Sequence, residues 1–247
     1  MMLKEAMDKK TRFTLMQTAQ SGHGKTSRAL TATRFGKVFI FDFDGKATGA
    51  ARKLPEALAK DVPANWQELV ELETFRDKPV DQAVSKLKEF IALGSKLPYS
   101  TVVVDTYTLL NDKYYEVVMG KKLETGGKAE RDEWGQINSK LTNFFNLLFQ
   151  LPCNLILNCH VAEAEDDVTK KTKYGQAGRG GHRFTLPGLF SDSNYMFMEN
   201  GKYKIRLKNS DTYPVNTNLP EKFIDANGLA VTASLSIFDD YAYRKGV

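Results

Sequence analysis

The stretch Gln20-Ser21-Gly22-His23-Gly24-Lys25-Thr26 constrains this 247-residue chain more than any other. It lies between an apolar, strand-like run, Phe13–Met16, and a predicted helix start. A glycine-rich turn in that position can wrap its amides around phosphates, while the lysine reaches β- and γ-oxygens and the threonine hydroxyl holds Mg²⁺. The phosphate-binding residues that we predict are Ser21, Gly22, His23, Gly24, Lys25, Thr26 and Ser27.

The loop departs from the full phosphate-binding pattern at one position. The pattern G-x-x-x-x-G-K-[ST] has glycine where this chain has Ala19. Alanine reaches positive φ less easily than glycine does, so we expect Gly22 and Gly24 to supply the bend. A solvated glycine-rich turn is the alternative interpretation, and the Lys25-Thr26 pair in register favours the phosphate loop.

Length and composition fit one α/β domain with insertions. Hydrophobic residues make up 42% and charged residues 26% of the chain, and no apolar run approaches the length of a membrane span. The first ten residues lack the apolar stretch of a secretory signal, so we expect a cytoplasmic protein without a membrane partner. A net charge of +5 and a pI near 9.0 fit a polyanionic partner, without separating DNA from RNA.

Both cysteines, Cys153 and Cys159, fall in one apolar run. As extended chain they would lie roughly 20 Å apart, which excludes a disulfide between them. Three scattered histidines and these two cysteines do not form the ligand pattern of a zinc site. We therefore expect reduced, buried cysteines and no structural zinc.

Apolar runs alternate with segments of helical spacing, which predicts an α/β fold with a mainly parallel sheet flanked by helices. Apolar positions mark a helix face within 80–91 and another within 134–148. The runs at 102–104 and 155–157 are typical of central strands covered on both faces. The predicted strands are Phe13–Gln17, Lys37–Phe43, Thr101–Val104 and Cys153–Asn158.

The C-terminal part of the sequence has a different character. Tyr195–Met198 and Lys202–Leu207 flank the dipeptide Asn200-Gly201, which predicts an antiparallel hairpin with a tight turn. We expect a single domain over residues 1–247, with a core at about 12–210 and a C-terminal extension at about 211–247.

Acidic side chains follow two of the predicted strands. Asp105 ends Thr101-Val-Val-Val-Asp105, at the sheet edge where ligands of open α/β folds bind, and could hold Mg²⁺ there. Asp42 and Asp44 occupy alternate positions at the end of the strand that begins at Lys37, so we expect them on one side of it. Asp44 is the candidate for orienting an attacking water. The alternative is that these acids only cap or solvate a loop.

The run Leu155-Ile-Leu-Asn158-Cys-His160 places a polar pair at a third strand end. A side chain there could touch the γ-phosphate or respond to its loss, which makes His160 a sensor candidate. A lone histidine is more often a structural residue, and that interpretation remains open.

The chain resembles the RecA-like branch of P-loop ATPases. The motifs that carry the resemblance are, in this order, the phosphate loop, Asp-x-Asp, Val-Val-Val-Asp-Thr and Asn-Cys-His. More narrowly, the chain is similar to phage RecA-core ATPases of the Sak-type single-strand-annealing group, which are grouped with AAA-type phage nucleotide-binding proteins. The resemblance covers about residues 12–210. Its anchors are Ser21–Ser27, Phe41–Gly45, Val102–Thr106 and Leu155–His160, with Arg206-Leu-Lys208-Asn209 as a weaker fifth.

The resemblance implies a RecA-like fold, ATP and Mg²⁺ as cofactors, and roles for particular residues. Lys25, Asp44, Asp105 and His160 would form the catalytic set, with Thr26 and Asp105 at the metal. RecA itself carries glutamate where this chain has Asp44. Basic residues on a late hairpin reach a neighbouring subunit's phosphates in such rings and filaments, so Arg206 and Lys208 become trans-acting candidates. The resemblance also implies a homo-oligomer and a single-strand-binding protein as a further partner.

Two glycine-containing segments, Gly120–Lys128 and Ala162–Arg183, are predicted to be mobile loops. The second begins acidic and then becomes basic around an aromatic residue. Cations, flexible backbone and a stacking ring suit a sequence-tolerant binder of single-stranded DNA, although such loops are also commonly just solvated. The DNA-binding candidates are Lys170, Lys171, Lys173, Tyr174, Arg179 and Arg183.

These patterns predict a Mg²⁺-dependent ATPase that acts on single-stranded DNA in phage recombination or annealing. Three alternatives remain open. The first is a nucleotide-binding, oligomerising structural or regulatory module with little hydrolysis, and the second is a DNA-translocating motor of the helicase or packaging kind. The third, a small-molecule kinase, would use the arginines of residues 179–183 as a lid, but the sequence offers no acceptor pocket.

Overall fold

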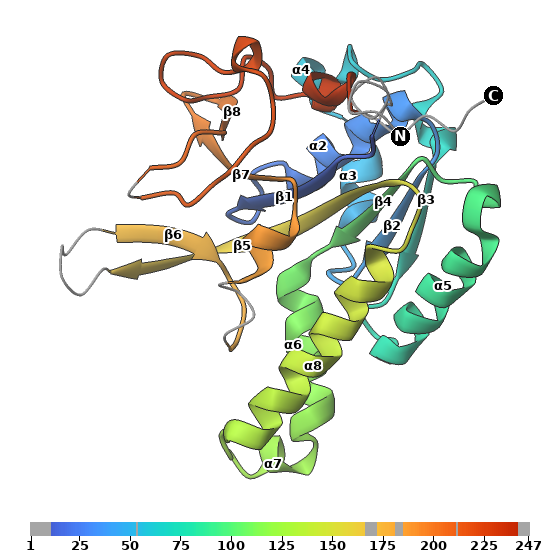
Figure 1. Cartoon of the computed structure of the whole chain (residues 1–247), viewed down its shortest axis with the longest axis vertical. Helices are drawn as coiled ribbons and strands as arrows, with labels where there is room; N and C mark the ends of the chain where they lie inside the picture. The colour runs from blue at the N-terminus through green and yellow to red at the C-terminus, as the bar shows by residue number, and fades with distance from the viewer. Residues whose placement is uncertain (1–10, 53, 166–171, 181–184, 211, 242–247) are drawn as a thin grey trace, which may run out of the picture.

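The computed structural model describes residues 11–52, 54–165, 172–180, 185–210 and 212–241 (Figure 1). Within these residues an eight-stranded sheet has the order β3-β2-β4-β5-β1-β7-β8, and β6 pairs with β5 outside that path. The strands are β1 (Thr14–Ala19), β2 (Val38–Asp42), β3 (Val70–Thr74), β4 (Thr101–Asp105), β5 (Asn154–Glu165), β6 (Thr172–Gln176), β7 (Asp192–Glu199) and β8 (Lys202–Arg206).

Every pair from β3 to β7 along this order is parallel, whereas β7–β8 and β5–β6 are antiparallel. The central parallel strands β2 and β4 are buried on both faces, because neither has an exposed residue along its length. The expected α/β architecture, a mainly parallel sheet flanked by helices with an antiparallel C-terminal hairpin, is confirmed. No helix in the described part of the chain is long and apolar enough to cross a bilayer.

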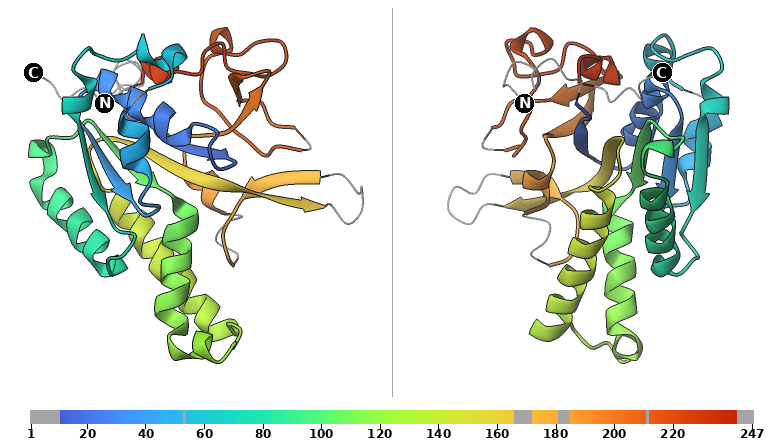
Figure 2. Two further views of the ribbon diagram at one scale, coloured as in Figure 1. Left: turned by 180° about the vertical axis from the view of Figure 1, so that it is seen from behind. Right: turned by 45° about the vertical axis from the view of Figure 1, so that its right-hand side comes forward.

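Helices cover both faces of the sheet (Figures 1 and 2). On one face Phe39, Phe41 and the alternate β4 residues pack against α5, α6 and α8. On the other face Ile40 and Val103 join the core that includes α2 residues. The helices are α2 (Lys25–Leu30), α3 (Ala47–Arg52), α4 (Glu56–Ala59), α5 (Val80–Leu93), α6 (Tyr107–Met119), α7 (Lys121–Glu124) and α8 (Arg131–Leu148).

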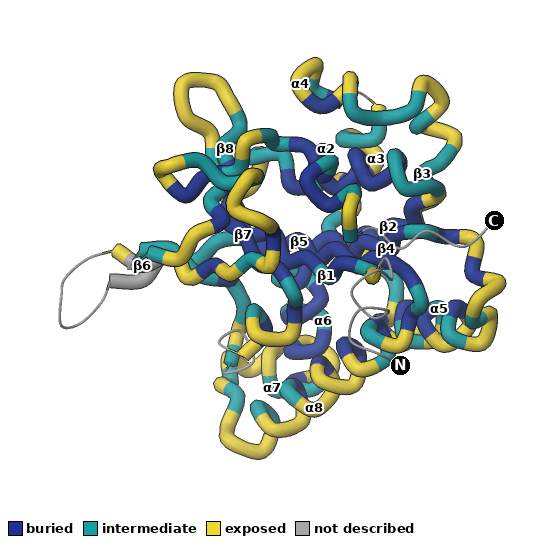
Figure 3. The backbone as a smooth tube through the Cα atoms, turned by 45° about the horizontal axis from the view of Figure 1, so that its top comes forward, coloured by how far each residue is buried: buried dark blue, intermediate teal, exposed yellow. Residues whose placement is uncertain are grey.

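Short 3-10 helices join these elements. The last of them brings the C-terminal part of the chain back onto the α2 face, where Leu235, Ile237 and Phe238 are buried. Figure 3 shows that β1, β2, β4 and β5 are buried at the centre of the molecule. The centres of the Phe238 and Phe13 rings lie 4.6 Å apart. The 3-10 helices are η1 (Thr31–Phe35), η2 (Trp66–Leu69), η3 (Gly94–Lys96), η4 (Leu186–Leu189), η5 (Glu221–Phe223) and η6 (Leu235–Phe238).

The two segments that we predicted to be loops contain regular structure, so this part of the sequence interpretation was wrong. Residues 121–124 form α7. Strand β5 runs on to Glu165 and pairs with β6, with Val161 opposite Gln176. A long strand pair can hold such polar residues because its two faces need not both be buried.

The predicted hairpin is present as β7 and β8, with Asn200 and Gly201 at its turn. Both residues have positive φ, 51° and 72°, as a tight two-residue turn requires. Strand β3 and helices α3, α4 and α6 were also not predicted from the sequence. Strand β3 is an edge strand with alternating acidic residues, so it lacks the apolar run that marks a central strand.

Candidate nucleotide-binding site

The glycine-rich loop connects β1 to α2 at the carboxyl edge of the sheet (Figure 1). Gly22 and Gly24 have φ of 79° and 80°, so these two glycines make the bend, as predicted. Ala19 still belongs to β1 and is buried. The chain therefore needs no glycine at this position, because the turn begins after it.

A cleft of about 290 Å³ opens beside this loop. Asp44 follows the end of β2 and Asp105 ends β4, as the sequence predicted. His160 lies within β5, which continues to Glu165, so the predicted strand end at His160 was wrong. His23 lies in the loop but is not part of the lining. The residues around the cleft are Ser21, Gly22, Gly24, Lys25, Thr26, Ser27, Asp44, Lys46, Ala50, Asp105, Thr106, His160 and Tyr203.

The Lys25 amine is held at the inner end of the cleft. Its Nζ donates to the carbonyl oxygens of Ala19 and Gln20, each at 3.0 Å, and lies 3.4 Å from His160 Nδ1. Burial lowers the pKa of Lys25, which is 5% exposed, while nearby Asp105 raises it. Burial and the adjacent lysine lower the pKa of His160, so this imidazole is neutral at pH 7 and can accept from Lys25.

Thr26 and Asp105 face each other across the cleft floor. The Thr26 hydroxyl donates to Asp105 Oδ2 at 2.6 Å. Asp105 is 3% exposed, and burial raises the pKa of its carboxyl group, while Thr26 and Asn158 oppose that shift. A hydroxyl and a carboxylate are thus fixed side by side at the sheet edge.

These two oxygen donors fit a magnesium ion. Mg²⁺ usually keeps several waters and takes one or two protein ligands together with substrate phosphates. Among the described residues, no group of three or more His, Cys, Asp or Glu side chains is placed to hold a metal. The pair therefore suits an ion shared with phosphates.

Asp42 and Asp44 have separate positions. Both Asp42 oxygens accept from backbone amides, those of Gly45 at 2.8 Å and Ala47 at 3.2 Å. Asp44 follows the end of β2, lines the cleft and pairs with Lys46 at 3.0 Å. The strand ends at Asp42, so the alternation that placed both acids on one side does not extend to Asp44. The capping interpretation describes Asp42.

Comparison with known proteins identifies the family. A sequence profile described as AAA domain matches residues 11–216, which is most of the chain. The chain belongs to the AAA domain family. Among solved structures, the crystal structure of the RadB recombinase has 17% sequence identity and a TM-score of 0.47, over 78% of this chain and 79% of that chain. This likeness is too distant to indicate a function. Among curated proteins, no sequence matches the chain.

Sequence reasoning missed Tyr203, which reaches the AAA domain's cleft from β8. A Cβ atom at Gly24 would lie 2.6 Å from a Tyr203 ring carbon, so a larger residue there would displace the Tyr203 ring in addition to straining the φ of 80°. The sequence held a weak signal, because Tyr203 alternates with Lys202 and Lys204 on β8 and must point to the opposite face.

The two trans-acting candidates lie outside the cleft. The Arg206 guanidinium lies 5.3 Å from the centre of the Tyr213 ring, and Nη1 donates to Asn227 O at 3.4 Å. Lys208 pairs with Glu221 at 3.4 Å on the surface. Lys208 is exposed, whereas Arg206 is partly buried.

The DNA-binding candidates divide into three groups. Lys170, Lys171 and Arg183 lie outside the described residues, as does the side chain of Lys173, whose backbone belongs to β6. Tyr174 stacks on Tyr213 with ring centres 4.9 Å apart.

Arg179 is attached to α6 by several contacts. Its Nε donates to Asp112 at 2.9 Å, and its backbone N–H donates to Asn111 Oδ1 at 2.8 Å. The guanidinium lies 4.3 Å from the centre of the Tyr115 ring. In this arrangement the side chain fastens residues 177–180 to the helix.

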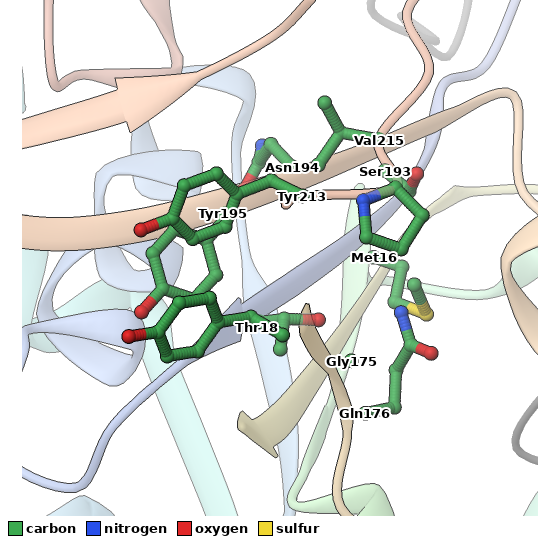
Figure 4. Close-up of a pocket in the computed structure, with 11 residues that line it drawn as sticks. Met16, Thr18, Gly175, Gln176, Ser193, Asn194, Tyr195, Tyr213 and Val215 are labelled. Carbon is green, nitrogen blue, oxygen red and sulfur yellow. The ribbon is translucent and has the colours of Figure 1, made fainter. Parts of the chain in front are cut away.

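A second cavity lies under β6 and β7 on the sheet face opposite α2 (Figure 4). Met16, Thr18, Tyr195 and Tyr213 contribute to its walls. Its volume is about 10 Å³, which is close to the least that one water needs. This cavity is too small for a nucleotide.

Proposed function

We propose that this AAA domain is a Mg²⁺-dependent ATPase of the RecA-like kind that acts on single-stranded DNA. The observation that supports it best is the convergence of Lys25, Thr26 and Asp105 on one cleft beside a glycine-rich loop. A lysine, a hydroxyl and a strand-end carboxylate in that relation are the parts that bind a nucleoside triphosphate with its metal.

In this proposal each side chain has one task. Lys25 exchanges its two carbonyl contacts for phosphate oxygens, and Thr26 and Asp105 hold Mg²⁺, which supplies positive charge to the phosphates when bound. Asp44 orients the attacking water once it separates from Lys46. His160, next to the Lys25 amine, responds to the γ-phosphate.

One face of the β7–β8 hairpin supports the proposed binding of single-stranded DNA. Cross-strand pairs place Arg206 opposite Tyr195, and Lys204 opposite Phe197. Tyr195 and Phe197 have ring centres 6.0 Å apart in a stacked arrangement. Tyr195 is only 6% exposed, so Phe197 is the ring available to a base, and Lys204 opposite it is available to a phosphate.

The sequence resemblance extends the proposal to phage recombination or annealing in the host cytoplasm. An oligomer would place Arg206 and Lys208 of one copy at the phosphates of the next. We also propose that the core and the C-terminal extension act as one domain, because buried residues of the extension pack against the α2 face.

The decisive experiment measures ATP binding and phosphate release for wild type, Lys25→Ala and Lys96→Ala. Lys96 is an exposed lysine far from the cleft lining, so its replacement controls for loss of charge alone. We expect Lys25→Ala to lose binding or turnover and Lys96→Ala to keep both. Unchanged turnover in Lys25→Ala would refute the site. Single-stranded DNA should stimulate wild type more than duplex DNA does.

A module that binds nucleotide but hardly hydrolyses it is the second candidate. The contact between Asp44 and Lys46 favours it, since an ion-paired carboxylate is a poor partner for water. ATP binding without phosphate release, with or without single-stranded DNA, would decide for this module.

A further inference from the structure

A row of buried polar residues crosses the sheet at one register. Asp42 pairs with Asp105, Asp105 with Asn158, Asn158 with Gln17, and Gln17 with Asn194. None of the five is more than 3% exposed. Buried amides in apolar strands are costly unless they are hydrogen-bonded, so their contacts need an explanation.

Three residues in and beside this row form a directed chain of hydrogen bonds, which we call the amide relay: Arg28, Gln17 and Asn158. Arg28 Nη1 donates to Gln17 Oε1 at 2.5 Å. Gln17 Nε2 donates to Asn158 Oδ1 at 2.8 Å and to the Lys25 carbonyl at 3.4 Å.

The direction of the relay follows from its first member. An arginine side chain only donates, so it must face the oxygen of the Gln17 amide. The Gln17 nitrogen then faces Asn158, and the Asn158 oxygen must face Gln17. The Asn158 Nδ2 is left for Asp105. Asn158 and Asp105 are register partners on the adjacent parallel strands β5 and β4, so their side chains leave the same face of the sheet side by side, and Nδ2 has no other hydrogen-bond partner among the described residues.

Arg28 remains charged although it is 0% exposed. Burial lowers the pKa of its guanidinium to about 9, which still leaves it protonated at neutral pH, and Asp192 opposes the shift. Its Nε donates to the Ala233 carbonyl at 2.9 Å. The C-terminal segment is fastened nearby, where the Leu235 N–H donates to Thr31 Oγ1 at 3.2 Å.

We propose that Arg28 and Gln17 are positioning residues that turn the nitrogen of the Asn158 amide toward Asp105 and so keep this carboxylate ready for Mg²⁺. Through Ala233, the C-terminal segment supports the same site from the far side of α2. The inference rests on the proposed nucleotide function, because it concerns the metal that accompanies the nucleotide.

Gln17→Glu tests the direction of the relay with almost no change of volume. Glutamate can pair with Arg28, so the buried cation keeps a partner. It has no N–H for the Asn158 oxygen, so the Asn158 amide must turn over and present its oxygen to Asp105. Two oxygens would then face each other, and the affinity of the site for Mg²⁺ should fall.

The measurement is ATP affinity by calorimetry, first in EDTA and then across a MgCl₂ titration. We expect roughly a tenfold higher Mg²⁺ requirement in Gln17→Glu, as for other residues behind a metal ligand, with unchanged affinity in EDTA. Mg²⁺ and ATP together should also raise the Tm of Gln17→Glu less than they raise the Tm of wild type. An unchanged Mg²⁺ requirement would overturn the inference.

Two further variants separate positioning from a general effect on folding. Asn158→Leu removes the amide that faces Asp105 and should raise the Mg²⁺ requirement in the same direction, and it serves if Gln17→Glu does not fold. Asn194→Leu removes the neighbouring buried amide of the same row, whose two polar atoms have no partner among the described residues, and should leave the requirement at the wild-type value. An equal rise in the Mg²⁺ requirement of Asn158→Leu and Asn194→Leu would show that these amides have a merely structural role. If wild type binds no ATP with Mg²⁺, the proposed function fails instead.

Discussion

Strands β2 and β4 both end in an aspartate, but the residues that follow the two strands give the two carboxylates different contacts. Asp42 and Asp105 end adjacent parallel strands and face each other in register. Both are buried, and burial raises the pKa of both carboxyl groups. Yet Asp42 accepts from two amides of its own loop, whereas Asp105 accepts from a side chain of the phosphate loop.

The residues after each strand explain the difference. After Asp42 the chain turns back at Gly45, whose φ is 73°, and brings backbone N–H groups to the carboxylate. After Asp105 it enters α6 with Thr106 as the cap, so no loop returns to the carboxylate. Register alone therefore does not assign a role to a strand-end acid. The next few residues decide whether it completes a turn or faces a ligand.

Replacing Asp105 with Asn should have the largest effect. We expect phosphate release to fall roughly 1,000-fold, because a neutral amide no longer offsets the metal charge. ATP affinity in EDTA should remain. Asp42→Asn serves as the matched control, and an equal loss of turnover there would break the distinction between the two strand ends.

Asp44 tests whether the loop after β2 contributes chemistry through a different residue. Asp44→Asn keeps the shape of the side chain but removes the carboxylate that would orient water. We expect turnover to fall on the order of 100-fold with ATP affinity retained. Single-turnover kinetics would measure this step. Full activity in the variant would favour the binding module over the ATPase.

Asp42→Ala should act on stability instead. The Gly45 and Ala47 amides would lose their acceptor inside the protein, at a cost of about 1–3 kcal/mol in the free energy of unfolding. Urea denaturation measures this quantity. The folded fraction should turn over ATP at close to the wild-type rate, and a stable but inactive variant would contradict the role assigned to Asp42.

The smallest effect is expected for Gly45→Ala. A left-handed alanine costs about 1–2 kcal/mol, and its Cβ would also meet the Arg76 side chain at 2.9 Å. Gly49→Ala is the control, because nothing lies within 4 Å of a Cβ there and its φ is not positive. Denaturation midpoints should fall for the first variant and hold or rise for the second.

The sequence predicted those parts of the molecule that depend on local patterns. The central strands are continuous apolar runs, and the phosphate loop and Asp105 follow directly from short motifs. The hairpin at Asn200-Gly201 was equally local. Where one residue type has a strong backbone preference, a single sequence carries the information.

The parts that escaped prediction depend on pairing between distant segments. Gln17 meets Asn158 only because β1 and β5 adopt a particular register, and no local pattern states that register. Tyr203 reaches the cleft for a similar reason, since β8 reaches the phosphate loop through its pairing with β7. Strand β6 was missed because charged and glycine residues are also typical of loops.

The position of β1 has a consequence for how the protein is made. Among the described strands this one is translated first, whereas both of its neighbours, β5 and β7, are translated much later. A nascent chain that ends before β5 holds the glycine-rich loop on a strand without either partner, and domains of parallel strands form slowly. A segment without β5 and β7 therefore lacks the strands that hold this loop in place, and we expect it to bind no nucleotide.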